Sequence, residues 1–183
     1  MKLNFVTSNE GKFRSFKNVA SSLDYDFERR ELDYPENHDS NSTLKIAEDG
    51  ARYCCKKLGE PAVVTDAGLF INTLNSFPGV NTGFALKTLG NRRILKLLEG
   101  EEKREAVFRL SIAFYSQEKG LISLTEETRG KITRELRGGK GFGFDPIFLP
   151  KGYENTFAER PELRDREGPL KPATQELVKR LQN

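Results

Sequence analysis

Two long segments of alternating apolar and polar residues constrain the fold of this chain more than any other feature. They span residues 104–117 (REAVFRLSIAFYSQ) and 120–132 (GLISLTEETRGKI), with a turn at Lys119-Gly120. Alternation with a period of two is typical of strands, and a short glycine-containing connection joins antiparallel neighbours. The sequence therefore predicts a pair of long antiparallel strands in the second half of the chain.

The segments before and after this pair alternate between strand and helix patterns. Apolar runs predict strands at 2–7, 24–32, 61–66 and 69–74, with a short one at 147–150. Helical spacing of apolar residues predicts helices at 12–23, 43–58, 91–100 and 174–181, with loops at 75–83 and 137–146. This order indicates an α/β fold with a mixed sheet, parallel at its start and antiparallel in the middle. No linker interrupts residues 1–183, so we expect a single domain.

Composition excludes several classes of protein. No run approaches the ~20 apolar residues of a membrane span, and the N-terminal MKLNFVTSNEGK turns polar too early for a signal peptide. The only cysteines, Cys54 and Cys55, are adjacent and cannot build a disulfide framework, which favours a reducing, cytoplasmic setting. A net charge of +3 is too small to indicate a nucleic-acid-binding protein.

Few residues are available for acid–base chemistry. The single histidine, His38, lies in the polar stretch PENHDSNS, where a surface loop position is expected. Proton transfer must therefore depend on carboxylates, lysines or metal-bound water. Four basic residues precede a glycine-rich loop and indicate either an anionic small ligand or a solvated basic face: Lys131, Arg134, Arg137 and Lys140.

Three glycine-bearing loops follow predicted strands: TSNEGK (7–12), TDAGL (65–69) and GGKGFGFDP (138–146). The first places Thr7, Ser8 and Asn9 before a helix, and Lys12 adds a positive charge. Helix N-termini and lysines favour phosphate, although this spacing is not that of a Walker A loop. The alternative interpretation is an ordinary loop and helix cap.

The second loop follows the apolar run Val63–Val64. We expect the strand to end at Asp66 and Gly68 to adopt a conformation closed to other residues, which would make this a structural turn. Alternatively, a carboxylate at the carboxyl end of a strand lies where open α/β sheets bind their ligands.

The third loop combines glycines with aromatic and acidic side chains. Phe142 offers a stacking surface for a flat base, and Asp145 could accept hydrogen bonds from the edge of that base. The alternative is a glycine-hinged strand start with Phe142 and Phe144 in the core.

Together the three loops resemble the inosine/xanthosine triphosphate pyrophosphatases. That family's pattern T-x-N-x-x-K is matched by Thr7, Asn9 and Lys12. Four further motifs follow in the same order, with Ala67 in the variable position of the first: D-[ST]-G-L at 66–69, P-G at 78–79, G-F-G-[YW]-D-P-x-F at 141–148 and T-F-A-E at 156–159.

The resemblance implies an elongated mixed sheet flanked by helices, two lobes with a central cleft, and usually a homodimer. It implies Mg²⁺-dependent hydrolysis of a nucleoside triphosphate to a monophosphate and pyrophosphate. By position, Lys12 and the backbone of 7–9 would hold phosphates, and Asp66 would bind the metal or orient the attacking water. Phe142, with Gly143 beside it, would stack on the base, Asp145 would meet the base edge, and Gly68 would lie close to the substrate.

The chain departs from the family where the chemistry is expected. Ser15, Lys45 and Thr65 stand where the family has acidic residues, and Gly168-Pro169-Leu170 replaces its S-H-R. Asp66 would then be the main metal ligand, with Glu48 as a weak substitute, or Lys45 could neutralise phosphates directly. Part of the lost base recognition could come from three other basic residues: Arg164, Arg166 and Lys171.

Three functions agree with these residues. The first is a diverged nucleotide hydrolase of this family, with Asp66 and Lys12 as catalytic residues. The second is a non-catalytic nucleotide-binding protein on the same scaffold. The third is a hydrolase that cleaves another bond, such as the N-glycosidic one, with Asp66 as the base.

Overall fold

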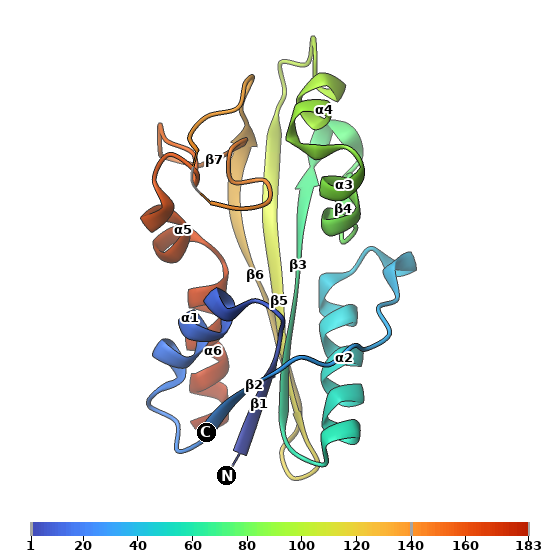
Figure 1. The fold of residues 1–183 in the computed structure, drawn as a ribbon, viewed down its shortest axis with the longest axis vertical. Coiled ribbons are helices and arrows are strands. Elements are labelled where there is room, and N and C mark those ends of the chain that lie inside the picture. Colours follow the sequence, from blue (N-terminus) through green and yellow to red (C-terminus); the bar gives the residue numbers. More distant parts are fainter. Residues whose placement is uncertain (1, 140, 183) are drawn as a thin grey trace. The chain divides into compact units, whose positions relative to one another are not determined.

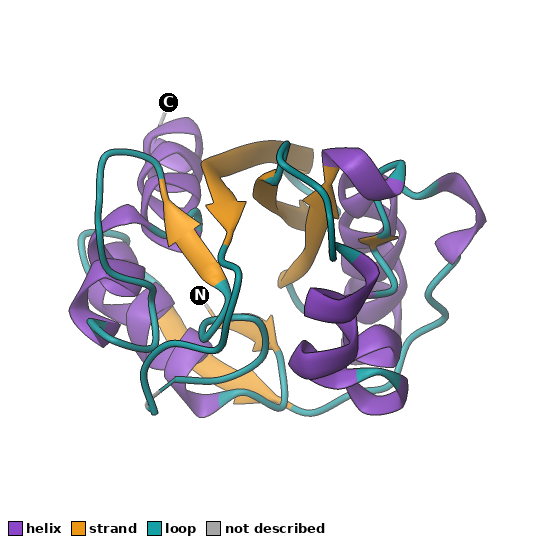
Figure 2. Cartoon of the chain, turned by 90° about the horizontal axis from the view of Figure 1, so that it is seen from above, coloured by secondary structure: helices purple, strands orange, loops and turns teal. Residues whose placement is uncertain are grey.

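The computed structural model describes residues 2–139 and 141–182. Helices pack against the strands of a mixed sheet (Figures 1 and 2), which confirms the predicted α/β class. The strand order is β2-β1-β3-β5-β6-β7, with β4 pairing to β3. The strands are β1 (Lys2–Val6), β2 (Asp26–Arg30), β3 (Ala62–Ile71), β4 (Pro78–Gly79), β5 (Glu105–Ser116), β6 (Gly120–Ile132) and β7 (Phe148–Pro150).

The predicted pair of long strands is present as β5 and β6. They are neighbours in the sheet and are joined by residues 117–119, which is too short a connection for a parallel crossover. The chain divides into two compact units, and β3, β5 and β6 contribute residues to both. Unit 1 contains residues 1–66, 110–126 and 170–183, and unit 2 contains residues 67–109 and 127–169.

The first three strands form a parallel part of the sheet in unit 1, and helices cover both of its faces. β1 pairs in parallel with β2 and β3. On one face, Phe16 of α1 (Glu10–Ala20) stacks on Phe5 at 4.4 Å between ring centroids. On the other face, α2 (Thr43–Leu58) packs Ala47 and Ala51 against Val6. The C-terminal helix α6 (Leu170–Gln182) lies beside α1 (Figure 1).

Unit 2 surrounds an aromatic core. Phe148 of β7 packs edge-on against Phe108 of β5 at 4.5 Å, and Phe157 lies beside both. The helices of this unit are α3 (Thr82–Thr88), α4 (Gly90–Leu97) and α5 (Pro161–Glu167). Ile94 of α4 and Leu163 of α5 are buried in the same cluster. Among the described residues, no helix is long and apolar enough to cross a membrane.

The structure corrects several predicted boundaries. β3 does not end at Asp66 but runs on through Ile71, so the predicted strand 69–74 is its continuation, followed by a 3₁₀ turn at Asn72–Leu74. The predicted helices at 12–23, 91–100 and 174–181 are observed at 10–20, 90–97 and 170–182. The last of these, α6, begins earlier than predicted. Pro172 does not prevent this, because it lies in the first turn of the helix, where proline is tolerated. Helices α3 and α5 were not predicted.

Candidate functional site

The loop after β1 in unit 1 is built around the start of α1. Asn9 caps this helix, because its Oδ1 accepts the backbone N–H of Lys12 at 2.9 Å. The backbone N–H of Asn9 in turn donates to Thr7 Oγ1 at 3.1 Å. The side chains of Thr7 and Asn9 thus hold the loop in shape, which is the ordinary capping arrangement, and Ser8 and the half-buried Lys12 lie on the same turn.

A cation that the sequence analysis missed lies over this loop. Arg29 Nη1 lies 3.4 Å from the carbonyl oxygens of both Thr7 and Ser8. In the parallel register of β1 and β2, Arg29 is the partner of Phe5, so its strand ends at the same edge of the sheet. Parallel pairing of the first two predicted strands was the signal that could have found it.

The two predicted residues on α2 are occupied by contacts within unit 1. Lys45 is exposed and forms an i,i+4 ion pair with Asp49, with Nζ and Oδ2 3.1 Å apart. Glu48 Oε1 accepts a hydrogen bond from the Ser123 hydroxyl of β6 at 2.5 Å. Across the described residues, no three His, Cys, Asp or Glu side chains come together as a metal site. Glu48 is therefore engaged within the fold, and Asp66 is the remaining predicted metal ligand.

Asp66 lies in β3 and is half-buried. Tyr34, also half-buried, packs its ring over Gly50 of α2, where an added methyl group would lie 2.7 Å from Tyr34 Cε2. Burial, with smaller contributions from the negative charges of Glu36 and Asp66, raises the pKa of the Tyr34 phenol. Tyr34 is thus a neutral, proton-bearing group in the electrostatic field of Asp66, and nothing in its sequence context indicated this.

Gly68 is required for a different reason from the one predicted. It does not have a positive φ; instead a Cβ at this position would lie 2.5 Å from the carbonyl oxygen of Gly79. Here β3 and β4 pair through Leu69 and Gly79. The close approach of two backbones, not a turn, excludes a side chain at Gly68.

In unit 2, the loop of residues 137–146 (of which Lys140 lies outside the described residues) was predicted to bind the base and is named the base loop for that prediction. Its two phenylalanines lie in different surroundings. Phe144 is 1% exposed and belongs to the core, whereas Phe142 is 52% exposed. The core interpretation is therefore right for Phe144 and wrong for Phe142, and stacking of Phe142 on a base stays a prediction. Gly143 has a φ of +65°, and its carbonyl accepts a hydrogen bond from Asn91 of α4 at 2.9 Å.

Asp145 lies beneath this loop and is 1% exposed. Its Oδ2 accepts the backbone N–H of Phe142 at 3.0 Å, and its Oδ1 is ion-paired with Arg164 of α5. The Arg164 guanidinium in turn lies 4.0 Å above the centre of the Phe142 ring. Burial lowers the pKa of Arg164 to about 10, so the side chain still carries its charge at neutral pH.

The basic residues ahead of the base loop do not form one cluster. Arg134 is an exposed partner of Glu102, and Arg137 pairs with Glu159. Lys131 lines a separate open groove of about 550 Å³ that residues of β5, β6 and β7 form, together with Arg129 and Lys151. None of the predicted site residues lines this groove.

Comparisons with known proteins agree on one family. The sequence pattern of the Ham1 family matches residues 3–177. The dITP/XTP pyrophosphatase of Methanopyrus kandleri is 48% identical over 160 residues, covering 87% of this chain and 84% of its own. That of Thermococcus kodakarensis is 41% identical, covering 87% and 85%. The Ham1 protein of Staphylococcus aureus has the same fold, with a TM-score of 0.86 over 100% of this chain and 98% of its own at 24% identity.

Proposed function

Because this chain belongs to the Ham1 family, we propose that it hydrolyses non-canonical purine nucleoside triphosphates to the monophosphate and pyrophosphate. The observation that carries this proposal is its 48% identity, over most of both chains, to a protein named dITP/XTP pyrophosphatase. In this reaction water attacks the α-phosphorus, the bond between the α-phosphorus and the bridging oxygen breaks, and pyrophosphate leaves. No observation favours the binding-only or the N-glycosidic alternative.

The residues of unit 2 support recognition of an oxopurine base. Phe142 is the exposed aromatic side chain of the base loop, and the Arg164 guanidinium lies against one face of its ring. Arginine only donates hydrogen bonds, so it suits the carbonyl oxygens of hypoxanthine and xanthine and not the amino group of adenine. Asp145 is buried and already bonded, so its proposed part is to hold Arg164. Gly143 lets the loop backbone approach the base.

The residues of unit 1 support a phosphate-binding role. The loop Thr7, Ser8 and Asn9 precedes the N-terminus of α1, which favours anions, and Lys12 lies in the first turn. Arg29 beside the loop, which is also ion-paired with Glu10 and Glu31, adds a second cation. We assign Asp66 the orientation and deprotonation of the attacking water, and Lys12 the neutralisation of charge on the phosphates.

Magnesium fits this chain poorly as a resident ion. Glu48 accepts a hydrogen bond from Ser123, and the described residues contain no group of three or more His, Cys, Asp or Glu that could hold a metal ion. Asp66 is therefore the one that remains of the two predicted carboxylate ligands. Mg²⁺ commonly binds through one or two carboxylates plus substrate phosphates. We therefore propose that the ion enters as part of the substrate, the magnesium triphosphate complex. A homodimer remains a prediction from the family resemblance, and a cytoplasmic location remains a prediction from the cysteine content.

A nucleotide panel tests the proposed function. We expect pyrophosphate release from dITP and XTP in the presence of Mg²⁺, and much less from ATP. The variant Asp66→Asn is expected to lower kcat at least ~100-fold, the size typical of losing a general base, and Asp26→Asn, an exposed position on β2, serves as the control. Free base among the products would support the N-glycosidic alternative, and binding without turnover the non-catalytic one. Full activity of Asp66→Asn would refute the assignment of Asp66.

A further inference from the structure

The motif Thr156-Phe157-Ala158-Glu159 has no part in the site described above, although it belongs to the family pattern. In the structure it lies beside the neck of the base loop. The two ends of that loop meet where the backbone N–H of Arg137 donates to the carbonyl of Pro146 at 2.9 Å. Just outside this point, the backbone N–H of Thr133 donates to the carbonyl of Ile147 at 2.8 Å.

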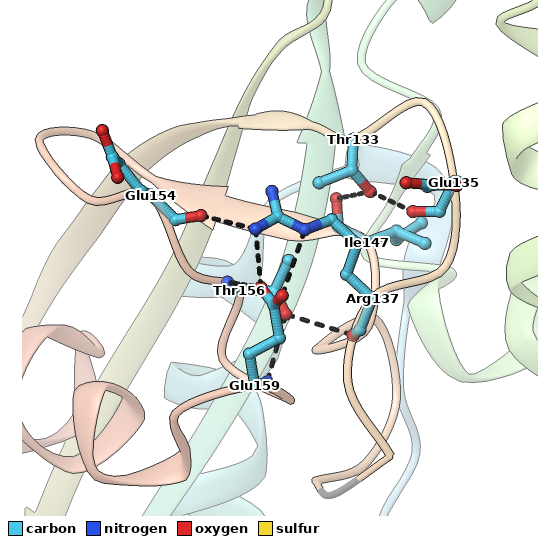
Figure 3. A network of polar contacts seen from close by, with 7 residues as sticks. All are labelled: Thr133, Glu135, Arg137, Ile147, Glu154, Thr156 and Glu159. Carbon is cyan, nitrogen blue, oxygen red and sulfur yellow. Dashed lines mark hydrogen bonds and ion pairs between the residues drawn. The ribbon is translucent and has the colours of Figure 1, made fainter.

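The Arg137 side chain joins this neck to residues 154–159 (Figure 3). Its Nη2 donates to the carbonyl of Glu154 at 2.6 Å and lies 3.0 Å from Glu159 Oε2. Its Nε donates to Glu159 Oε1 at 3.2 Å. One guanidinium thus contacts both carboxylate oxygens of Glu159, the paired geometry that arginine makes best.

Thr156 completes the connection from inside the protein, where it is fully buried. Its hydroxyl donates to the carbonyl of Arg137 at 3.2 Å, and its backbone N–H donates to Glu159 Oε2 at 2.7 Å. The Thr156 N–H, followed by the charge of Arg137, holds the pKa of Glu159 below its usual value. The carboxylate is therefore charged, and its bonds are made, throughout the neutral range.

The same segment also touches the base loop at two other points. At Gly138, which has a φ of +77°, a Cβ would clash with the backbone carbonyl group of Ala158. At the far end of the loop, the Ala158 backbone N–H donates to the carbonyl of Asp145 at 3.3 Å. Residues 154–159 therefore contact the beginning, the neck and the end of the loop that carries Phe142.

We infer that Glu159 and Arg137 are positioning residues for base recognition: their ion pair fixes the base loop, so that Phe142 and the Arg164 guanidinium held by Asp145 stand ready for the base. This inference rests on the proposed function for its substrate. The pair differs from the other ion pair ahead of the loop, Arg134–Glu102, whose side chains are 62% and 84% exposed. The Arg137 and Glu159 side chains are 31% and 25% exposed, so their pair is held within the fold.

The test uses Glu159→Ala, Glu159→Gln and Arg137→Lys, with Glu102→Ala as the matched control. For XTP we expect Glu159→Ala to raise KM about tenfold, the effect of losing one charge-assisted hydrogen bond, with little change in kcat. The preference for XTP over ATP, as a ratio of kcat/KM values, should fall as well. Glu159→Gln, whose amide oxygen still accepts one bond, should lie between Glu159→Ala and the natural protein. Arg137→Lys should resemble Glu159→Ala because lysine lacks the paired donors.

Hydrogen exchange provides a readout that needs no substrate. In Glu159→Ala, exchange of the backbone amides in residues 138–145 should become faster, while Glu102→Ala leaves it unchanged. If the pair were merely structural, Glu159→Ala would lower the amount of folded enzyme. The apparent kcat would then fall, while KM, the substrate preference and the exchange of these amides would stay unchanged. That pattern would overturn the inference. If the natural protein released no pyrophosphate, the proposed function would fail, and exchange in 138–145 would still decide whether the pair orders the loop.

Discussion

At the scale of single residues, the ion pair of Asp145 and Arg164 joins a buried charge to a side chain that we propose recognises the base. Asp145 is almost fully buried, so its charge depends on Arg164 and on the Phe142 N–H. Burying an unpaired carboxylate is costly. The ion pair therefore fixes Arg164 over Phe142, and in the proposed function the same contact that makes the buried charge tolerable would also preorganise the base-binding surface.

This coupling predicts the outcome of a double-mutant cycle. Arg164→Met should lower the free energy of unfolding by ~3 kcal/mol, the lower end for a broken buried pair because a third of the Arg164 side chain is exposed. Adding Asp145→Asn should recover at least ~1 kcal/mol, since the uncompensated charge is then gone. Urea unfolding of the four proteins measures both values. Strictly additive losses would show that the two side chains do not depend on one another.

The residues of the candidate site were predictable to different degrees. Asparagine and glycine indicated the loops at 7–12 and 137–146, because helix capping favours asparagine and a positive φ favours glycine. The pattern could not say that Phe144 points into the core while Phe142 is exposed, because that depends on the packing of unit 2. Arg29 was missed because its position over Thr7 depends on the pairing of β1 with β2, which is a contact between distant residues.

At the scale of elements, helices with strong end signals were predicted best. α2 begins after Ser42, whose hydroxyl accepts the Lys45 N–H, and ends at Gly59, which has a left-handed conformation. Its predicted bounds were correct for that reason. α3 and α5 have seven residues each, and each carries one buried residue, Ala85 and Leu163 respectively. So short a helix shows no apolar periodicity, and its stability comes from the core it packs against.

Strand β3 offers a sharp prediction at this scale. Gly68→Ala should lower the free energy of unfolding by ~1–3 kcal/mol, because the new methyl group meets the Gly79 carbonyl at 2.5 Å and the two backbones must separate. Gly83→Ala in α3, where a Cβ meets nothing within 4 Å, is the control and should be neutral or stabilising by up to ~1 kcal/mol. Thermal unfolding of both variants distinguishes the two cases. Equal effects would mean that the β3–β4 contact is looser than the structure indicates.

At the scale of the whole molecule, acidic groups whose pKa values are shifted in opposite directions limit the pH range in which the protein is stable. Several carboxylates have lowered pKa values because they accept hydrogen bonds or pair with cations: Glu28, Glu159, Glu162, Glu167 and Glu176. A lowered pKa in the folded state adds stability above the ordinary value of 4.5, and this stability is lost as the pH falls through the folded pKa. The acid side of the stability profile should therefore drop below about pH 4.5.

The alkaline side depends on buried acids that stay neutral. Burial, helped by the neighbouring Cys55, raises the pKa of the Cys54 thiol from 9.0 to about 11, and burial raises that of Tyr34 above its ordinary 10.0. The unfolded chain ionises first, so stability is full below pH 9 and falls as the pH rises toward 11. Denaturant midpoints measured from acid to alkaline pH should be constant around neutral pH and should fall on either side. On the alkaline side, Cys54→Ala should make this fall smaller. An alkaline fall unchanged in Cys54→Ala would mean that the Cys54 thiol is not the group that titrates.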